Sequence, residues 1–374
     1  MSTTAELEAR IEALRARDVA IVDPRQTYIG PEVQLDRIGE GTILHPGTRL
    51  HGSELYLGPG VELGSEGPAV VRDSAFGPGA SLASGYVAGT VLLDDAKLGA
   101  NAHVRPGTLL EEQASTAHCV GLKQTILLAY VTLGSLINFC DVLMAGGTSR
   151  KDHSEVGSGF IHFNFTPWGE RGDKATASLI GEVVRGVFLR EQRIFLGGVA
   201  GVVGPAEVGY GAIVGAGQIV RRDVDPGAFV LRATKTVERT LRPKWKDRLQ
   251  PRLGKNIAYV AQLFALREWY HEVRLARLAT DDPRRPPVEM AVGLLDRAIA
   301  ERRKQLTRFA EERGGRCPSF DVEGLPACPW TLEPDGVSHL EWVAGLGDAE
   351  VEAGQAWLAS VVEGVVEGAR AELV

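Results

Sequence analysis

An apolar residue recurs every six positions through much of the first two thirds of the chain, and glycine often follows it. The runs are Ile38, Leu44 and Leu50; Leu57 and Leu63; Val70, Phe76 and Leu82; Leu92, Leu98, Val104, Leu110, Thr116, Leu122 and Leu128; and Val202, Val208, Val214 and Val220. Six residues of α-helix rotate by roughly 600°, so these positions would spiral around a helix axis. Short strands separated by sharp corners instead point each apolar residue inward. The pattern therefore predicts a hexapeptide-repeat parallel β-helix.

The alternative architecture is a glycine-rich β-sandwich, whose strands of about 5–6 residues would be spaced irregularly. The 45 glycines among 374 residues cluster before about residue 230, and corners such as GPG at 58–60 and HPG at 45–47 recur. Three hexads make one coil of the β-helix. We therefore expect a triangular prism with turns at its corners.

Helical periodicity replaces this pattern at both ends of the chain. The N-terminal segment carries Leu7, Ile11 and Leu14 at helical spacing, and helical spacing returns from about residue 243. The later helical positions are Ile257, Val260 and Phe264; Trp269 and Val273; Leu295, Ile299, Leu306 and Phe309; and Trp357, Val361 and Val365. The proline-rich stretch 316–330 predicts a non-helical linker. The expected organisation is a helix over 1–20, a β-helix over 21–240 and a helical domain over 241–374.

Composition excludes several classes of protein. Hydrophobic residues make up 44% and charged residues 24%, and a net charge of -7 gives no nucleic-acid footprint. No apolar run approaches the ~18 residues of a membrane span, and the first residues lack the apolar core of a signal peptide. The four cysteines, Cys119, Cys140, Cys317 and Cys328, form no CxxC pair, which indicates neither a zinc site nor a redox motif. We expect a reduced, cytoplasmic protein without a metal.

Three charged residues fall into outward positions one coil apart. Arg105, Lys123 and Asp141 are separated by three hexads each, so they are expected to stack on one outer surface, on strands ~4.8 Å apart. Stacked cations repel each other unless an anion lies between them, and arginine and lysine are the usual ligands of phosphate. One interpretation is a phosphate site; the other is a solvated surface on which Asp141 is the counter-ion.

Several motifs resemble a known family. They are VDPRQTYIG (22–30), LGANAHVRPGTLL (98–110), VGSGFIHFNF (156–165), SLIG (178–181) and VGYGAIVGAGQIVRRDV (208–224). Residues 5–235 resemble the acetyltransferase half of the bacterial bifunctional N-acetylglucosamine-1-phosphate uridyltransferase / glucosamine-1-phosphate acetyltransferase. The resemblance implies a left-handed β-helix, a homotrimer with sites between subunits, and acetyl-CoA or another acyl-CoA as donor. The uridyltransferase half is expected to be absent, since the match begins at the first residues and no glycine-rich phosphate loop follows an early strand. The helices after 243 have no recognised counterpart.

The resemblance also implies roles for individual residues. Arg105 and Lys123 match the cations that hold the sugar phosphate, and Lys174 is the nearest match to a further phosphate-binding lysine. Asn164 matches an asparagine of the acetyl-transfer site. Ala216 matches an alanine that contacts acetyl-CoA.

Four positions depart from the family pattern. Ser135 stands where the family has its general-base histidine, Asn138 replaces a tyrosine, Glu155 a substrate-binding asparagine, and Gly198 a serine near the acetyl group. Segments 147–155, 165–176 and 181–194 are insertions. The aromatic stretch 163–168 either lines a ligand pocket or covers a strand edge.

The missing histidine matters because acyl transfer to an amine requires a deprotonated amine, and general-base help is worth ~10²–10⁴ in rate. His162, His118, His153 and Glu155 are the candidate replacements. Three hypotheses follow: an acyltransferase acting on a phosphorylated sugar or sugar nucleotide, a non-catalytic binder of such compounds, or a trimeric assembly module. In the third, the prism trimerises and the C-terminal helices recruit a protein partner.

Overall fold

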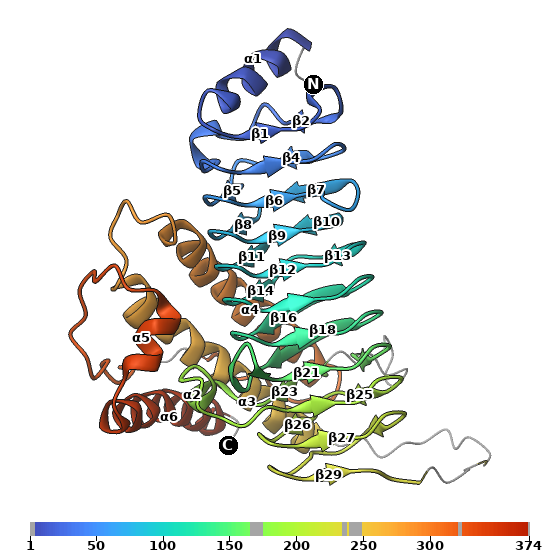
Figure 1. Cartoon of the computed structure of the whole chain (residues 1–374). Coiled ribbons are helices and arrows are strands. Elements are labelled where there is room, and N and C mark those ends of the chain that lie inside the picture. Colours follow the sequence, from blue (N-terminus) through green and yellow to red (C-terminus); the bar gives the residue numbers. More distant parts are fainter. Residues whose placement is uncertain (1–3, 165–174, 234–237, 239–248, 321–323, 373–374) are drawn as a thin grey trace.

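The computed structural model of the chain describes residues 4–164, 175–233, 238, 249–320 and 324–372. Its main body is a column of stacked coils in which neighbouring strands pair in parallel (Figure 1). Helix α1 (Thr4–Arg15) lies at the N-terminal end of the column, and further helices lie along its side. The predicted parallel β-helix, with a short N-terminal helix and a C-terminal helical region, is confirmed. The domain limits at 20 and 240 stay predictions.

The strands form the three faces of a prism. Face 1 is an 11-stranded sheet, and faces 2 and 3 belong to a 16-stranded sheet. Face 1 consists of β1 (Ala20–Ile21), β3 (Ile43–Leu44), β6 (Glu62–Leu63), β9 (Ser81–Leu82), β12 (Lys97–Leu98), β15 (Ser115–Thr116), β17 (Thr132–Leu133), β21 (Glu155–Val156), β24 (Phe195–Leu196), β27 (Ile213–Val214) and β29 (Phe229–Val230). Face 2 consists of β2 (Tyr28–Ile29), β4 (Arg49–His51), β7 (Ala69–Arg72), β10 (Gly85–Ala88), β13 (Ala102–Val104), the first parts of β16 (Gly121–Leu127) and β18 (Asn138–Met144), β22 (Ile161–Phe163), β25 (Gly201–Val203) and β28 (Ile219–Val220). Face 3 consists of β5 (Tyr56–Leu57), β8 (Ala75–Phe76), β11 (Thr90–Leu92), β14 (Thr108–Leu110), the second parts of β16 and β18, β23 (Ser178–Ile180) and β26 (Glu207–Val208).

The six-residue apolar positions point into the prism, except Val70 and Leu128. Leu44, Leu98, Val104 and Val214, for example, are all at most 1% exposed. Val70 is wrong as a core position: it is only half-buried, and its successor Val71 points inward. Val71 pairs with Leu50 of the preceding coil, so this coil is longer than three hexads and its extra residues shift the inward position. Leu110 pairs with Leu127, so Leu127 points inward and Leu128 is wrong as a core position: it takes the outward position that Glu111 has one coil earlier.

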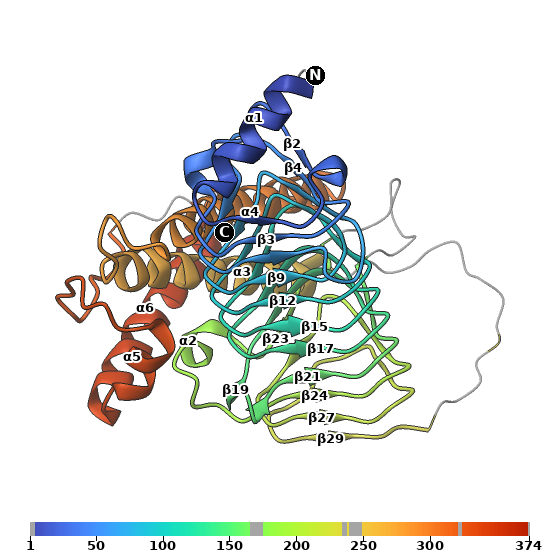
Figure 2. The same cartoon turned by 45° about the horizontal axis from the view of Figure 1, so that its top comes forward.

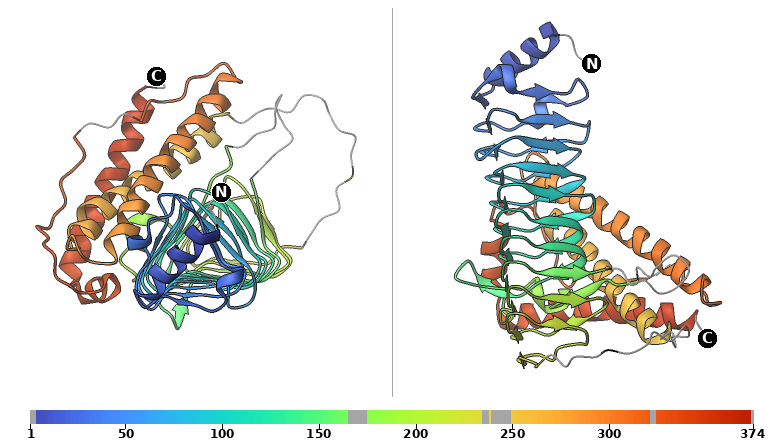
Figure 3. Two further views of the ribbon diagram at one scale, coloured as in Figure 1. Left: turned by 90° about the horizontal axis from the view of Figure 1, so that it is seen from above. Right: turned by 90° about the vertical axis from the view of Figure 1, so that its right-hand side faces the viewer.

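Helices after residue 249 form a compact unit, which we call the helical cap. It contains α3 (Leu249–Glu268), the π-helical segment η3 (Trp269–Leu275), α4 (Arg285–Glu311), α5 (His339–Gly345) and α6 (Asp348–Ala371). The cap packs along face 3, with α4 crossing β8, β11 and β14 (Figures 2 and 3). The short helix α2 (Val183–Gly186), in the insertion 181–194, joins it: Val183 N–H donates to Gln262 Oε1 at 2.8 Å.

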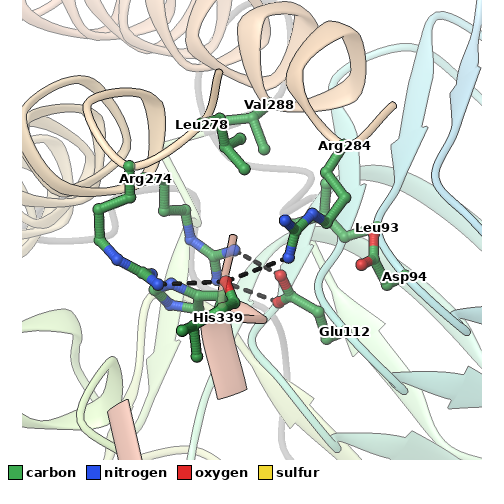
Figure 4. Close-up of a pocket in the computed structure, with 10 residues that line it drawn as sticks. Leu93, Asp94, Glu112, Arg274, Leu278, Arg284, Val288 and His339 are labelled. Carbon is green, nitrogen blue, oxygen red and sulfur yellow. Dashed lines mark hydrogen bonds and ion pairs between the residues drawn. The ribbon is translucent and has the colours of Figure 1, made fainter. Parts of the chain in front are cut away.

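A buried cluster of charges fastens the cap to face 3. Arg274 of η3 donates to both carboxylate oxygens of Glu112, at 2.6 and 3.1 Å, and lies 3.2 Å from Glu111 Oε1. Tyr270 O–H donates to the same Glu111 oxygen at 2.8 Å. Figure 4 shows Arg274 and Glu112 meeting in a small pocket that His339 also lines. The positive charge of Arg274 in the cap thus faces the glutamates of the prism across the interface. This pairing avoids the high cost of an isolated buried charge.

Asp94 lines the same pocket from the prism side. Burial and the nearby charge of Glu112 raise the pKa of its carboxyl to about 7, although Arg284 and Arg274 act in the opposite direction. The interface therefore contains a carboxyl group that titrates near neutrality.

Replacing Gly85 should destabilise the prism, whereas the same change in the cap should not. Gly85 has φ +126°, and a Cβ there would overlap the carbonyl oxygen of Ala102 in the next coil. We expect Gly85→Ala to lower the free energy of unfolding by about 2 kcal/mol or more in denaturant titrations. Gly254→Ala, at an exposed position of helix α3 with open space around it, is the matched change and should raise stability by about 0.5–1 kcal/mol.

Asp94 should make stability fall as the pH rises. The folded protein holds this proton up to about pH 7, whereas the unfolded chain loses it near 3.8. Between these values the folded state binds more protons, so the free energy of unfolding decreases with pH. Asp94→Asn should therefore stabilise the protein at pH 8, by on the order of 2 kcal/mol, and change little at pH 4. Asp95→Asn is the exposed neighbouring control; an equal effect at pH 8 in both variants contradicts the assignment.

Candidate functional site

Arg105 and Lys123 lie in adjacent coils at the corner between faces 2 and 3, which we call the cation corner. Val104 pairs with Leu122, and Arg105 N–H donates to Leu122 O at 2.9 Å, so the two cations stand one above the other. Both are exposed. Within the described ranges, neither forms an ion pair with a carboxylate. Their stacking is as predicted, and two unpaired neighbouring cations favour a bound anion.

The prediction that Asp141 is the third member of this stack is wrong. Lys123 pairs with Cys140 of the next coil, and not with Asp141. The corner between Lys123 and Thr125 is turned by Gln124 alone, at φ +49°, whereas Pro106 and Gly107 turn the corner one coil earlier. This coil is therefore one residue shorter than three hexads.

Cys140 takes the place expected for Asp141. Arg105 Nη2 donates to Cys140 Sγ at 3.5 Å. Burial raises the pKa of the thiol, and Asp141 raises it further, while Arg105 and Lys123 lower it. The thiol is thus neutral and leaves the charge of the two cations uncompensated.

Asp141 instead belongs to the interface with the cap. It is 6% exposed, and its Oδ1 lies 2.8 Å from Arg302 Nη2 of α4. Its Oδ2 accepts a hydrogen bond from Asn164 Nδ2 at 3.3 Å. Asn164, the predicted acyl-transfer residue, therefore lies beside the cation corner and contacts the carboxylate that fixes α4.

A second corner, between faces 1 and 2, stacks five residues in successive coils: His118, Ser135, Ser158, Gly198 and Ala216. We call it the serine corner. The carbonyl oxygen of each residue accepts a hydrogen bond from the next coil, where the donor is the N–H one position after the stacked residue. Leu136 N–H donates to His118 O at 3.1 Å, and Gly217 N–H donates to Gly198 O at 3.0 Å. Gly198 and Ala216, predicted separately as acyl-CoA contacts, are thus one coil apart. Glycine is required at Gly198 because a Cβ would lie 2.7 Å from Ser158 O.

Ser135 and His118 contact each other directly at this corner. Ser135 Oγ lies 3.1 Å from His118 Nδ1, and Ser135 N–H donates to Ser158 Oγ at 3.2 Å. Counting three full hexads in every coil misses this pair, because the coil that separates positions 118 and 135 is one residue shorter.

The other predicted bases lie elsewhere. His162 points into the prism, is 2% exposed, and shares a 2.8 Å hydrogen bond with Ser178 Oγ. Burial lowers its pKa to about 4, although nearby Asp141 acts in the opposite direction. Glu155 is exposed on face 1, away from the cation corner. Lys174 lies outside the described residues.

The insertion 147–155 forms a small hairpin of β19 (Gly147–Ser149) and β20 (Asp152–His153). Arg150 fastens it to face 1 by donating to Gln113 O at 2.7 Å and to Tyr130 O at 3.0 Å. Burial lowers the pKa of His153 in this hairpin. Glu155 and His153 line a shallow groove there, so they belong to a different surface from the two corners.

The stacked hexads define the chain as a hexapeptide-repeat β-helix protein. It is distantly similar to curated proteins named bifunctional protein GlmU. The protein of Mycolicibacterium vanbaalenii is 29% identical over 223 residues, which are 60% of this chain and 40% of that protein. That of Pseudarthrobacter chlorophenolicus is 31% identical (61% and 41% covered), and that of Mycobacterium tuberculosis 27% identical (75% and 48% covered). The chain thus spans less than half the length of these relatives.

No family model matches the chain. Among solved structures, Arabidopsis UDP-N-acetylglucosamine acyltransferase aligns with 71% of this chain and 96% of that chain, at 14% identity and a TM-score of 0.23, a likeness too weak to support an argument. None of the described helices is long and apolar enough to cross a membrane. Among described residues, no group of three or more His, Cys, Asp or Glu is placed to hold a metal.

The Asp141–Arg302 pair should matter for stability through compensation of charge. Asp141→Asn leaves Arg302 buried without its counter-charge, which should cost about 3–5 kcal/mol in chemical unfolding. The double variant Asp141→Asn with Arg302→Met removes both charges and should recover most of that loss. Additive losses in the double-mutant cycle contradict a direct coupling of the two side chains.

Proposed function

We propose that the chain is an acyl-CoA-dependent acyltransferase that acts on a phosphorylated sugar or a sugar nucleotide. The observation that carries this proposal is the cation corner, where Arg105 and Lys123 stand exposed, stacked and without carboxylate partners among the described residues. Two such cations provide charge-assisted hydrogen bonds for a phosphate group. The resemblance of residues 5–235 to the glucosamine-1-phosphate acetyltransferase half of the bifunctional enzyme family supports the same substrate class.

The placement of the two corners is compatible with a phosphorylated acceptor lying along face 2. His118 and Lys123 stand at opposite ends of the same stretch of chain, five residues apart; because Cys119 turns the corner and the strand begins at Gly121, they are separated by less than the ~16 Å of a fully extended strand. Gly121 leaves a side-chain-free position between them, and Asn138 in the next coil offers an exposed amide. A phosphate held at the cation corner thus directs the sugar towards the serine corner, where Gly198 and Ala216 would receive the acyl-CoA.

The second candidate function is non-catalytic binding of the same phosphosugars. The burial of His162 and the position of Glu155 favour it, because neither residue can act as a base beside the cation corner. The proposal also includes a cytoplasmic location, a homotrimer with sites between subunits, and recruitment of a partner by the helical cap. These three points rest on the sequence resemblance and composition.

Calorimetry with acetyl-CoA, in the presence and absence of glucosamine 1-phosphate, distinguishes the two functions. The acyltransferase should bind both compounds, and the non-catalytic binder only the phosphosugar. If acetyl-CoA does not bind up to millimolar concentration, the acyltransferase proposal is wrong.

The phosphate site is tested by Arg105→Ala combined with Lys123→Ala. Hydrogen bonds to charged groups are worth about 1.5–3 kcal/mol each, so glucosamine 1-phosphate should bind at least about 100-fold more weakly. Arg49→Ala combined with Lys97→Ala removes two exposed cations elsewhere on the prism and should leave affinity nearly unchanged. Equal losses in both double variants would indicate only a general electrostatic effect.

A further inference from the structure

The serine corner contains a hydroxyl and an imidazole in the arrangement of a nucleophile and its base. Ser135 Oγ and His118 Nδ1 are 3.1 Å apart, within the hydrogen-bond reach that such pairs require. When the imidazole carries its proton on Nε2, Nδ1 accepts the serine proton. Both residues face solvent, so a substrate can approach.

The backbone at this corner is left-handed, as it is at other corners of the prism. Leu136 and Val199, which follow Ser135 and Gly198 in their coils, have φ values of +59° and +51°. The left-handed region is unfavourable for a β-branched residue such as Val199, and the equivalent places after Ser158 and Ala216 are occupied by Gly159 and Gly217.

Leu136 and Val199 expose large apolar side chains on this corner. Leu136 is 61% and Val199 81% exposed, so neither is held there by burial in the described chain. Leu136 directly follows Ser135 and Val199 stands two coils further on, about 10 Å along the stack, so they provide apolar surface suited to the methyl or longer carbon chain of an acyl group.

From this geometry we infer that Ser135 is an acyl-accepting nucleophile activated by His118, and that the acyl group passes through a serine ester. The inference rests on the proposed acyltransferase function. In the first step, Ser135 Oγ gives its proton to His118 and bonds to the thioester carbonyl carbon. The carbon–sulfur bond breaks, and the CoA thiolate takes the proton from His118.

In the second step, an amine or hydroxyl of the acceptor attacks the ester carbonyl carbon and gives its proton to His118. The ester carbon–oxygen bond breaks, and Ser135 Oγ recovers the proton. No oxidant or reductant is needed. The serine then fulfils a role of its own at the position where the sequence resemblance leads one to expect a histidine.

The experiment is incubation of the full chain with acetyl-CoA without acceptor, acid quenching and intact mass measurement. We expect one added acetyl group, mapped to Ser135 by peptide analysis and absent in Ser135→Ala. His118→Ala should slow its formation by about 10²–10⁴-fold. Ser115→Ala, on face 1, and His45→Ala, just after β3 and four coils before His118, should acylate as the unaltered chain does.

The outcomes separate this inference from the proposed function. If acetyl-CoA binds and is turned over with glucosamine 1-phosphate, but no adduct forms or Ser135→Ala retains full turnover, the acyl-serine inference is overturned and the acyltransferase function stands. If acetyl-CoA does not bind in the calorimetric measurement, both are overturned. An adduct at Ser135 that transfers its acetyl group when glucosamine 1-phosphate is added supports both.

Discussion

The ladder of backbone hydrogen bonds between successive coils determines which side chains of this molecule can meet. Strands only two or three residues long cannot be stable alone, so each coil relies on its neighbours for its backbone partners and on one inward apolar residue per hexad for its core. The register between neighbouring coils then determines which side chains are stacked. The single residue by which the Gln124 corner is shortened places a thiol, and not a carboxylate, above Lys123. The same shortened coil places Ser135 directly above His118.

This dependence explains how much the sequence could predict. The six-residue period is enforced by the core, so it reveals the prism and the helices at its ends, and it places Arg105 under Lys123 because that coil contains three full hexads. It fails where corners lengthen or shorten, since corner residues lie outside the core of the prism and their number does not appear in the apolar pattern. The predicted place of Val70 is wrong because its coil is longer than three hexads, and that of Asp141 is wrong because its coil is shorter.

The remaining features of the site depend on contacts between distant parts of the chain. Glu111 occupies an outward position of its coil, yet it is buried because Tyr270 and Arg274 of the cap cover it. Arg302 reaches Asp141 in the same way. No local sequence pattern in the prism predicts these partners, because they depend on how the cap packs against the prism and not on the repeat. His162 shows the converse case: an attractive residue type whose alternation along β22 points it into the core.

The position of the cap has a consequence for cooperativity. In a solenoid each repeat contacts only its neighbours, so such proteins can lose their end repeats one at a time. Here α4 crosses β8, β11 and β14, and further contacts of the cap reach α2 and Asp141. These long-range contacts join the middle and later coils into one unit that opens together, while the first coils, nearest α1, depend on nearest neighbours alone. The coils that carry Arg105, Lys123 and Ser135 thus belong to the part of the molecule in which local fraying is most strongly suppressed.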